Sequence, residues 1–223
     1  MRAHETTIRV ILPLRRQCQH RGRRLPGGGL LYAQEDVLPQ RPSKDRSAGD
    51  WIGHECGSAP ITVWAAGDED AAYAAVGAID GRNFWARFKK IMPFEPVSDE
   101  FAVDEQGRPD SDIDGTLDIY LAPAGRLATK DGQFSGMCVG LGTTTRMPTW
   151  IMIDQELRGL DLEAILAHEI FHSFQYALDA YEEKWWKEAS ADWAEEYIDV
   201  NYSTDEYVPD AFDGQKFLLK TIN

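Results

Sequence analysis

Residues 168–172 read His168-Glu169-Ile170-Phe171-His172, which is the H-E-x-x-H pattern. On an α-helix, residues four apart lie on one face, with Cβ atoms about 5–6 Å apart. Two imidazoles at that spacing can bind one Zn²⁺ ion, and the glutamate beside the first can act as general base on a zinc-bound water. Shuffling this composition gives roughly 0.006 expected matches, so chance is a poor explanation. The pattern predicts two zinc ligands, His168 and His172, and a base, Glu169.

A third ligand is expected, because catalytic zinc usually takes three protein ligands and leaves one position for water. Glu188 follows His172 by sixteen residues. Residues 179–183 are expected to turn the chain, so that a second helix presents Glu188 to the metal. Asp192 lies four residues further on, on the same face of that helix. We expect Asp192 to accept a hydrogen bond from the far ring nitrogen of a ligand histidine.

The residues before the pattern predict the helix that carries it. Asp161 is expected to cap the helix at its N-terminus. Leu162, Leu166 and Ile170 recur four apart and form an apolar stripe. No glycine or proline falls between residues 160 and 180. The pattern therefore lies on a helix with one face in the core.

The rest of the chain predicts an α+β fold. A long helix is expected over residues 68–91, although Gly77 and Gly81 are possible points of interruption. Strands are expected at residues 60–65, 117–121 and 149–154. The expected architecture is a small mixed sheet packed on the long backing helix and on the H-E-x-x-H helix, followed by a short helical C-terminal part.

The order of these residues resembles a known family. H-E-x-x-H followed by Glu188 and then Asp192 is similar to the gluzincin metallopeptidases, of which thermolysin is the best-known type. A closer likeness is to a group of bacterial secreted metalloproteases with an A-H-E-x-F-H-x-F-Q core followed by W-W-x-E-x-x-A-x-W-x-E-[ED]. Those pieces are residues 167–175 and 185–196 here. The spacer before Glu188 is shorter than in thermolysin, so the loop geometry is not carried over.

The resemblance implies a zincin-like fold and zinc-dependent hydrolysis of peptide bonds in a protein or peptide substrate. It assigns His168, His172 and Glu188 as metal ligands and Glu169 as the base. It also implies an extracellular or periplasmic location. No convincing signal peptide accompanies that expectation, because the apolar stretch at residues 8–14 is short and interrupted.

Two other zinc families fit less well. Metzincins continue as H-E-x-x-H-x-x-G-x-x-H, whereas Gln175 and Leu178 stand at the later glycine and histidine positions here. Peptide deformylases take an upstream cysteine as third ligand. Cys138 is upstream, but residues 136–140 lack the surroundings of that family.

Simpler interpretations remain open. The histidines could be hydrogen-bonded core residues, and Glu188 could be a solvated helix residue. Three tryptophans near it are interpreted as packing anchors rather than as a substrate surface. They are Trp185, Trp186 and Trp193.

A catalytically inactive zincin-fold binding module is the main alternative function. The donor that would stabilise an oxyanion is not identifiable, since nothing selects among the tyrosines that follow Glu188. They are Tyr197, Tyr202 and Tyr207. The C-terminal lobe after Glu188 is also expected to be small or truncated.

Charge divides the chain into two parts. Residues 1–46 carry a net charge of +6, and the remainder carries −20. Residues 1–50 are predicted to be a basic, disordered leader, and residues 51–223 a zincin-like domain. The acidic body argues against a nucleic-acid partner, although binding through residues 1–46 is a third hypothesis. No run of 18 apolar residues occurs, so no membrane span is expected.

Three further features carry weaker predictions. Residues 110–115 read D-x-D-x-D-G, the beginning of an EF-hand loop, so Ca²⁺ is a second candidate cofactor beside an ordinary acidic turn. Cys56 and Cys138 could form a disulfide or remain free thiols. The strand at residues 149–154, or the glycine-rich segment 136–142, is the candidate edge strand that pairs with extended substrate.

Overall fold

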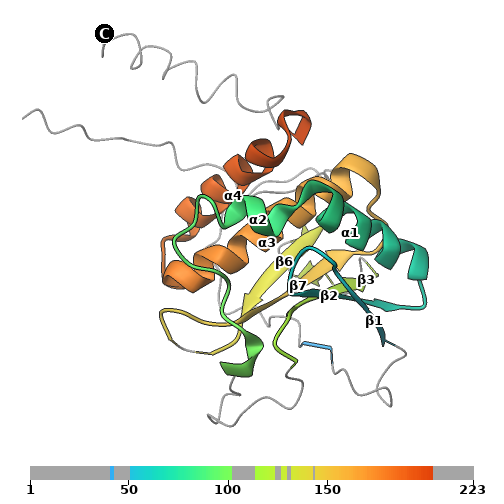
Figure 1. Cartoon of the computed structure of the whole chain (residues 1–223), viewed down its shortest axis with the longest axis horizontal. Coiled ribbons are helices and arrows are strands. Elements are labelled where there is room, and N and C mark those ends of the chain that lie inside the picture. Colours follow the sequence, from blue (N-terminus) through green and yellow to red (C-terminus); the bar gives the residue numbers. More distant parts are fainter. Residues whose placement is uncertain are drawn as a thin grey trace, which may run out of the picture. The chain divides into compact units, whose positions relative to one another are not determined.

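The structure is a computed structural model that describes residues 41–42, 51–101, 114–123, 127–129, 132–142 and 144–202. These residues form a five-stranded sheet with helices packed on one face (Figure 1). Its strands are β1 Trp51–Glu55, β2 Ile61–Ala66, β3 Leu117–Ala122, β6 Gly136–Gly140 and β7 Thr149–Asp154. A separate two-stranded sheet joins β4 Ala128–Thr129 to β5 Gly132–Gln133. The predicted α+β class is confirmed.

The main sheet is mixed, as predicted. Its order is β1-β2-β3-β7-β6, in which β2, β3 and β7 are parallel and the outer strands β1 and β6 are antiparallel to their neighbours. The three predicted strands are confirmed as β2, β3 and β7, because parallel strands buried on both faces are largely apolar runs. β1 was not predicted. Since β7 lies between β3 and β6, it is not an edge strand, and β6 is.

The helices lie together on the same side of the sheet (Figure 1). They are α1 Glu69–Arg82, α2 Phe84–Phe88, α3 Gly159–Asp179 and α4 Lys184–Ile198, with 3₁₀ turns at Asp99–Phe101 and Val200–Tyr202. α3 is the predicted helix of the H-E-x-x-H pattern, and α4 is the predicted helix after it. Among the helices in the described ranges, none is long and apolar enough to cross a membrane.

The predicted single helix over residues 68–91 is two helices. Gly77 and Gly81 both lie inside α1 and do not interrupt it. The break occurs at Asn83, whose φ of 55° is in the left-handed region that asparagine tolerates better than most residues. This conformation ends α1 and begins α2, so the prediction located the interruption at the wrong residues.

The start of α3 also differs from the prediction. The helix begins at Gly159, two residues before Asp161, and no side chain caps it. Asp161 instead lies in the first helical turn, where its carboxylate is favourable to the positive end of the helix dipole. Asp161 therefore lies near the helix N-terminus as predicted, but the prediction that it is the N-cap was wrong.

Alternate residues of the strands give the sheet two different faces. On the helix-covered face, the register aligns Val63, Ile119 and Ile151 in one row, and all three are fully buried. α3 covers this face with residues such as Phe174, whose ring lies 5.8 Å from that of Phe88. Fully burying one such side chain contributes about 1.5–3 kcal/mol. The buried face of α3 therefore holds its histidine-bearing face at a fixed place beside the sheet.

The opposite face is aromatic and includes a buried ion pair. Tyr120 and Trp150 pack edge to face with ring centroids 5.9 Å apart. Nearby, Arg41 forms ion pairs with Asp118 and Asp99, whose side chains are 0% and 1% exposed. This network joins a residue far upstream in the sequence to the centre of the sheet.

Arg41 belongs to the segment predicted as a leader. Its contacts show that this part of residues 1–50 packs against the domain. Residues 1–40 and 43–50 lie outside the described residues, so their predicted disorder stays a prediction.

The predicted calcium loop is described only in part, since residues 110–113 lie outside the described ranges. Asp99, Asp114 and Asp118 each bring one oxygen within 4.8 Å of the others. Arg41 already supplies a positive charge to two of these carboxylates. Calcium binding therefore stays a prediction.

Candidate metal centre

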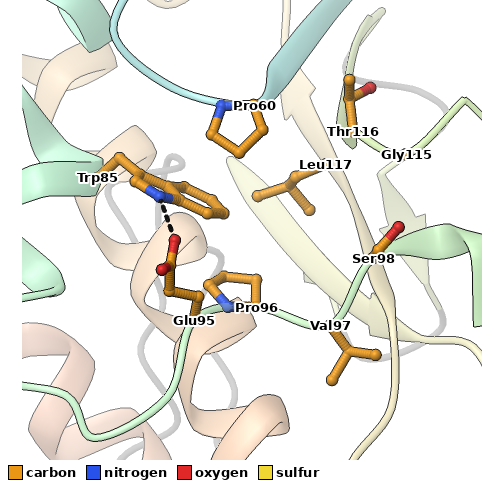
Figure 2. A pocket seen from close by; sticks show the side chains of 9 residues that line it. All are labelled: Pro60, Trp85, Glu95, Pro96, Val97, Ser98, Gly115, Thr116 and Leu117. Atoms are coloured by element: carbon orange, nitrogen blue, oxygen red, sulfur yellow. Dashed lines mark hydrogen bonds between the residues drawn. The ribbon is translucent and has the colours of Figure 1, made fainter.

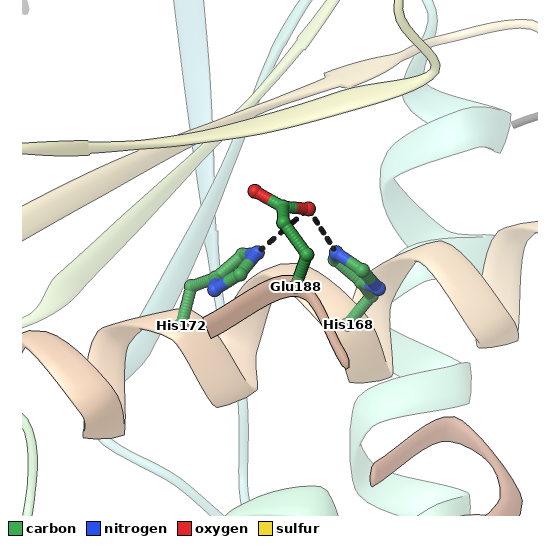
Figure 3. A group of neighbouring side chains, drawn as sticks. All are labelled: His168, His172 and Glu188. Atoms are coloured by element: carbon green, nitrogen blue, oxygen red, sulfur yellow. Dashed lines mark ion pairs between the residues drawn. The ribbon is translucent and has the colours of Figure 1, made fainter. Parts of the chain in front are cut away.

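The two histidines of the pattern lie one turn apart on α3. The ring centroids are 4.7 Å apart, and His168 and His172 are 2% and 8% exposed. Glu188, from α4, extends between the two rings (Figure 3). Its Oε2 lies 3.6 Å from Nε2 of His168 and 3.9 Å from Nε2 of His172. The three residues predicted as zinc ligands therefore come together.

Their spacing suits a single small cation. One ligand atom from each of the three residues lies within 4.8 Å of the other two. A tetrahedral zinc ion with bonds of about 2.0–2.1 Å holds its ligand atoms about 3.3 Å apart. The side chains thus fit the ion after small rotations.

The second ring nitrogen of His168 faces two carboxylates on α4. Its Nδ1 lies 2.8 Å from Oε1 of Glu195 and 3.3 Å from Oδ1 of Asp192. The Glu195 side chain is 2% exposed, whereas that of Asp192 is 34% exposed. Asp192 is near the predicted position, but Glu195 is the closer and more buried partner. A proton held on Nδ1 by this contact would leave the lone pair of Nε2 for a metal ion.

The second ring nitrogen of His172 is held in the same way by Gln175. Nδ1–H donates to Oε1 of Gln175 at 2.6 Å. The amide nitrogen of Gln175 in turn donates to Ser190 Oγ at 2.7 Å and to the carbonyl of Lys187 at 2.9 Å. These bonds fix which end of the amide faces the histidine, and therefore fix the tautomer of His172. Both histidines present Nε2 to the same point.

Burial and charge set opposite protonation tendencies for the two rings. Burial alone would lower the pKa of His168, but hydrogen bonds to Asp192, Glu188 and Glu195 raise that pKa well above its usual value. Burial lowers the pKa of His172 to about 4, and the charge of His168 acts in the same direction. Glu188 has a lowered pKa because its contacts with the histidines outweigh its own desolvation. The centre therefore combines a carboxylate, a neutral imidazole and an imidazole that a cation would deprotonate.

The predicted base lies between the histidines and the edge strand. Glu169 is 5% exposed, and its carboxylate accepts a hydrogen bond from the backbone N–H of Cys138 on β6. Burial raises the pKa of Glu169 to about 7; the charge of His168 opposes this rise, and the charge of Glu188 adds to it. A group whose pKa lies near neutral pH is well suited to take and return a proton.

Tyr176, on α3, was not among the tyrosines that the sequence offered as donors. It lies four residues after His172 on α3. Its ring lies against Gly140 of β6, and the ammonium of Lys187 lies 4.6 Å from the ring centroid. Burial raises the pKa of Tyr176, and the charges of Glu169 and Glu188 raise it further. The charges of these two carboxylates thus act on the Tyr176 hydroxyl.

Two of the three tyrosines that follow Glu188 have other contacts. Tyr202 donates from its hydroxyl to Glu163, and Tyr197 stacks on Trp193 with ring centroids 5.4 Å apart. Tyr207 lies outside the described residues. The spacing of Tyr176 after His172, one helical turn, was a signal that the sequence offered.

The tryptophans of α4 do not act as packing anchors, contrary to the prediction. Trp185, Trp186 and Trp193 are each about half exposed. α4 is instead buried through small or aliphatic residues such as Ala194 and Ile198. The small residues allow α4 to approach α3 closely enough for Glu188 to reach the histidines.

Cys56 and Cys138 are free thiols in the structure, so the disulfide alternative does not hold. Burial raises the pKa of both thiols to about 12. Sγ of Cys138 lies 3.6 Å from Oγ of Ser173, and the ligand atoms that converge come from His168, His172 and Glu188.

A separate cavity lies away from this centre (Figure 2). Its volume is about 160 Å³, below the roughly 300–1,000 Å³ typical of small-molecule sites. The Trp85 indole N–H, on one wall, donates to Glu95 at 3.0 Å. The residues that line the cavity are Pro60, Trp85, Glu95, Pro96, Val97, Ser98, Gly115, Thr116 and Leu117. None of the candidate metal ligands is among them.

Comparisons with protein-family models, with curated proteins and with solved structures find no match to this chain. Its function is therefore argued from the geometry of the centre.

Proposed function

We propose that this chain is a zinc-dependent peptidase of the gluzincin type with a zincin-like fold. One observation carries the proposal. His168, His172 and Glu188 converge on one point, while the opposite ring nitrogens are held by Glu195 and Gln175. Hydrogen-bonded core histidines need partners, but they have no need for a shared third ligand facing both Nε2 atoms. Metal ligation accounts both for the convergence of the three side chains and for the partners that hold the opposite ring nitrogens.

The residues of the chain have separate tasks in the proposed reaction. His168, His172 and Glu188 would hold zinc, which when bound lowers the pKa of a coordinated water to about 7 and polarises a carbonyl group. Glu169 accepts the proton of the attacking water on a carboxylate oxygen. It then delivers that proton to the nitrogen of the leaving amine. Its burial against β6 supports this double role, because a desolvated carboxylate with a pKa near 7 can do both.

A protein or peptide substrate is supported by the edge strand. β6 ends the sheet beside Glu169, and an extended peptide can pair with an open edge through its backbone. Such pairing would place a peptide bond alongside the zinc ligands. Export to the periplasm or the extracellular space, which the family resemblance implies, is part of the same proposal.

Tyr176 is our candidate for the donor that stabilises the oxyanion of the tetrahedral intermediate. The coupling of its hydroxyl to the charges of Glu169 and Glu188 supports this role. A single donor of this kind contributes about 10²–10³-fold to kcat.

Substitution of the base tests the proposal. We expect Glu169→Gln to retain near one zinc per chain and to lose at least about 10²-fold in peptide cleavage. Glu196→Gln, an exposed neighbour of the site with the same change of charge, is the matched control. Equal cleavage by the Glu169→Gln variant and the wild type would reject the assignment. Tight zinc binding with no cleavage of a broad peptide library by wild type would favour the inactive binding module instead.

A further inference from the structure

Gly136 lies so close to Glu169 that no side chain fits between them. A Cβ atom built on Gly136 would lie 2.8 Å from both Cγ and Oε1 of Glu169, and 2.7 Å from Cγ2 of Ile165. Ordinary van der Waals contact begins at 3.4 Å. The side chain of Glu169, the predicted base, therefore packs directly against the backbone of β6.

The same strand directs a backbone donor at that base. Ser135 accepts from Asp154 at 2.8 Å, and Leu141 donates to Pro148 at 2.7 Å, so the odd-numbered residues of this segment bond to β7. In an antiparallel pair the bonded residues alternate with residues whose N–H and C=O groups point away. The Cys138 N–H thus points away from β7, on the free side of the edge strand. There it donates to the carboxylate of Glu169.

We propose that Gly136 and the backbone N–H of Cys138 form a cradle that positions the carboxylate of Glu169 for proton transfer. The inference rests on the proposed peptidase function, since it concerns the orientation of that base. Gly136 has no side chain, so the Glu169 carboxylate can lie directly against β6. The Cys138 N–H holds one oxygen of that carboxylate in place by a hydrogen bond. The atoms nearest to a Cβ at Gly136 belong to Ile165 and Glu169, neither of which is a proposed ligand, so we expect the cradle to affect proton transfer and not zinc binding.

The distances give the size of the expected effect. A methyl group at residue 136 would displace the Glu169 carboxylate by roughly 0.6 Å to reach ordinary contact. A displacement of about 1 Å at a reacting group can lower the rate about 10²-fold. We therefore expect Gly136→Ala to lower kcat about 10- to 100-fold, with KM and zinc affinity within about twofold of the wild type.

A matched control separates this effect from general damage to the sheet. Gly53 lies on β1, at the other edge, and a Cβ there would meet two ring atoms of Trp64 at 2.9 Å. Gly53→Ala thus introduces similar crowding far from Glu169, and we expect its kcat to be unchanged. Equal losses of kcat in the two variants would overturn the proposal.

The double variant Gly136→Ala/Glu169→Gln tests whether the glycine acts through the base. If it does, adding Gly136→Ala to Glu169→Gln lowers kcat no further, because the base is already absent. If the two losses multiply, Gly136 has a separate structural role and the cradle is rejected.

Hydrogen exchange gives a readout that requires no activity. An outward-pointing N–H on an edge strand exchanges rapidly unless it is bonded, so the Cys138 amide should be protected in the wild type and in Gly53→Ala. We expect Gly136→Ala to speed its exchange at least tenfold in zinc-free protein. Unchanged protection would reject the cradle even in a chain that cleaves peptides. Loss of protection in a chain that cleaves nothing would keep the cradle and reject the peptidase.

Discussion

Glu195 is expected to control zinc affinity although it is not a ligand. Its Oε1 lies 2.8 Å from Nδ1 of His168, and its side chain is 2% exposed. The substitution Glu195→Gln keeps the shape and an acceptor oxygen but removes the negative charge. The imidazole of His168 then becomes a weaker donor to the metal, because its Nδ1–H is no longer polarised by an anion.

The magnitude follows from the burial of this contact. Loss of an outer partner of a zinc-bound histidine lowers affinity about 10- to 100-fold, or about 1.4–2.7 kcal/mol. Glu195 should lie at the upper end of that range, because its contact is short and desolvated. Asp192 is 3.3 Å from the same nitrogen and its side chain is 34% exposed, so Asp192→Asn should lower affinity tenfold or less.

The assay is competition for zinc against a chromophoric chelator at fixed pH and ionic strength. Circular dichroism of each zinc-free variant would verify that the fold is retained. Glu196→Gln serves as control, since Glu196 is exposed and carries the same charge on the adjacent position. The reasoning is refuted if Glu195→Gln binds zinc as tightly as Glu196→Gln. A larger loss for Asp192→Asn than for Glu195→Gln would return the role to Asp192, as the sequence predicted.

Two further substitutions test other parts of the structure. Tyr176→Phe should lower kcat about 10²-fold or more with little change in KM, because the hydroxyl would act only on the developing oxyanion; an unchanged kcat in steady-state peptide cleavage would remove Tyr176 from the mechanism. Arg41→Ala should lower the free energy of unfolding by about 3–5 kcal/mol, because it leaves the buried carboxylate of Asp118 without its cation. Urea denaturation would measure this loss against Lys89→Ala, whose ion pair with Glu95 is about half exposed and should contribute no more than about 1 kcal/mol. Similar losses in these two variants would show that the Arg41 pair is not the buried network described above.

The convergence of the three candidate zinc ligands was predictable because their spacing is a property of one helix and a short connection. His168 and His172 needed only helical periodicity, and Glu188 needed one further assumption, that residues 179–183 turn the chain. The same periodicity could have identified Glu195, which lies seven residues after Glu188 on the same face of α4. Glu195 was not predicted because Asp192, four residues after Glu188, already offered a carboxylate for the far ring nitrogen of a histidine.

Other features depend on contacts that no local pattern encodes. The edge position of β6 follows from the strand order, and its approach to Glu169 follows from the packing of α3 on the sheet. The helix break at Asn83 was masked by Gly77 and Gly81, which are more common interrupters in isolation. The tryptophans of α4 were expected inside because of their size, yet Ala194 and its small neighbours allow the close helix packing instead.

The candidate ligands and their partners all fall within one helical hairpin, residues 168–195, whereas the cradle for Glu169 comes from β6. Contacts close in sequence form with little loss of loop entropy, while contacts between distant segments form later in folding. We therefore expect the hairpin of α3 and α4 to acquire its affinity for zinc before the sheet has closed over Glu169. Zinc binding and catalytic activity would then arise at separate stages of folding. A chain that has bound zinc would still lack activity until β6 packs against Glu169.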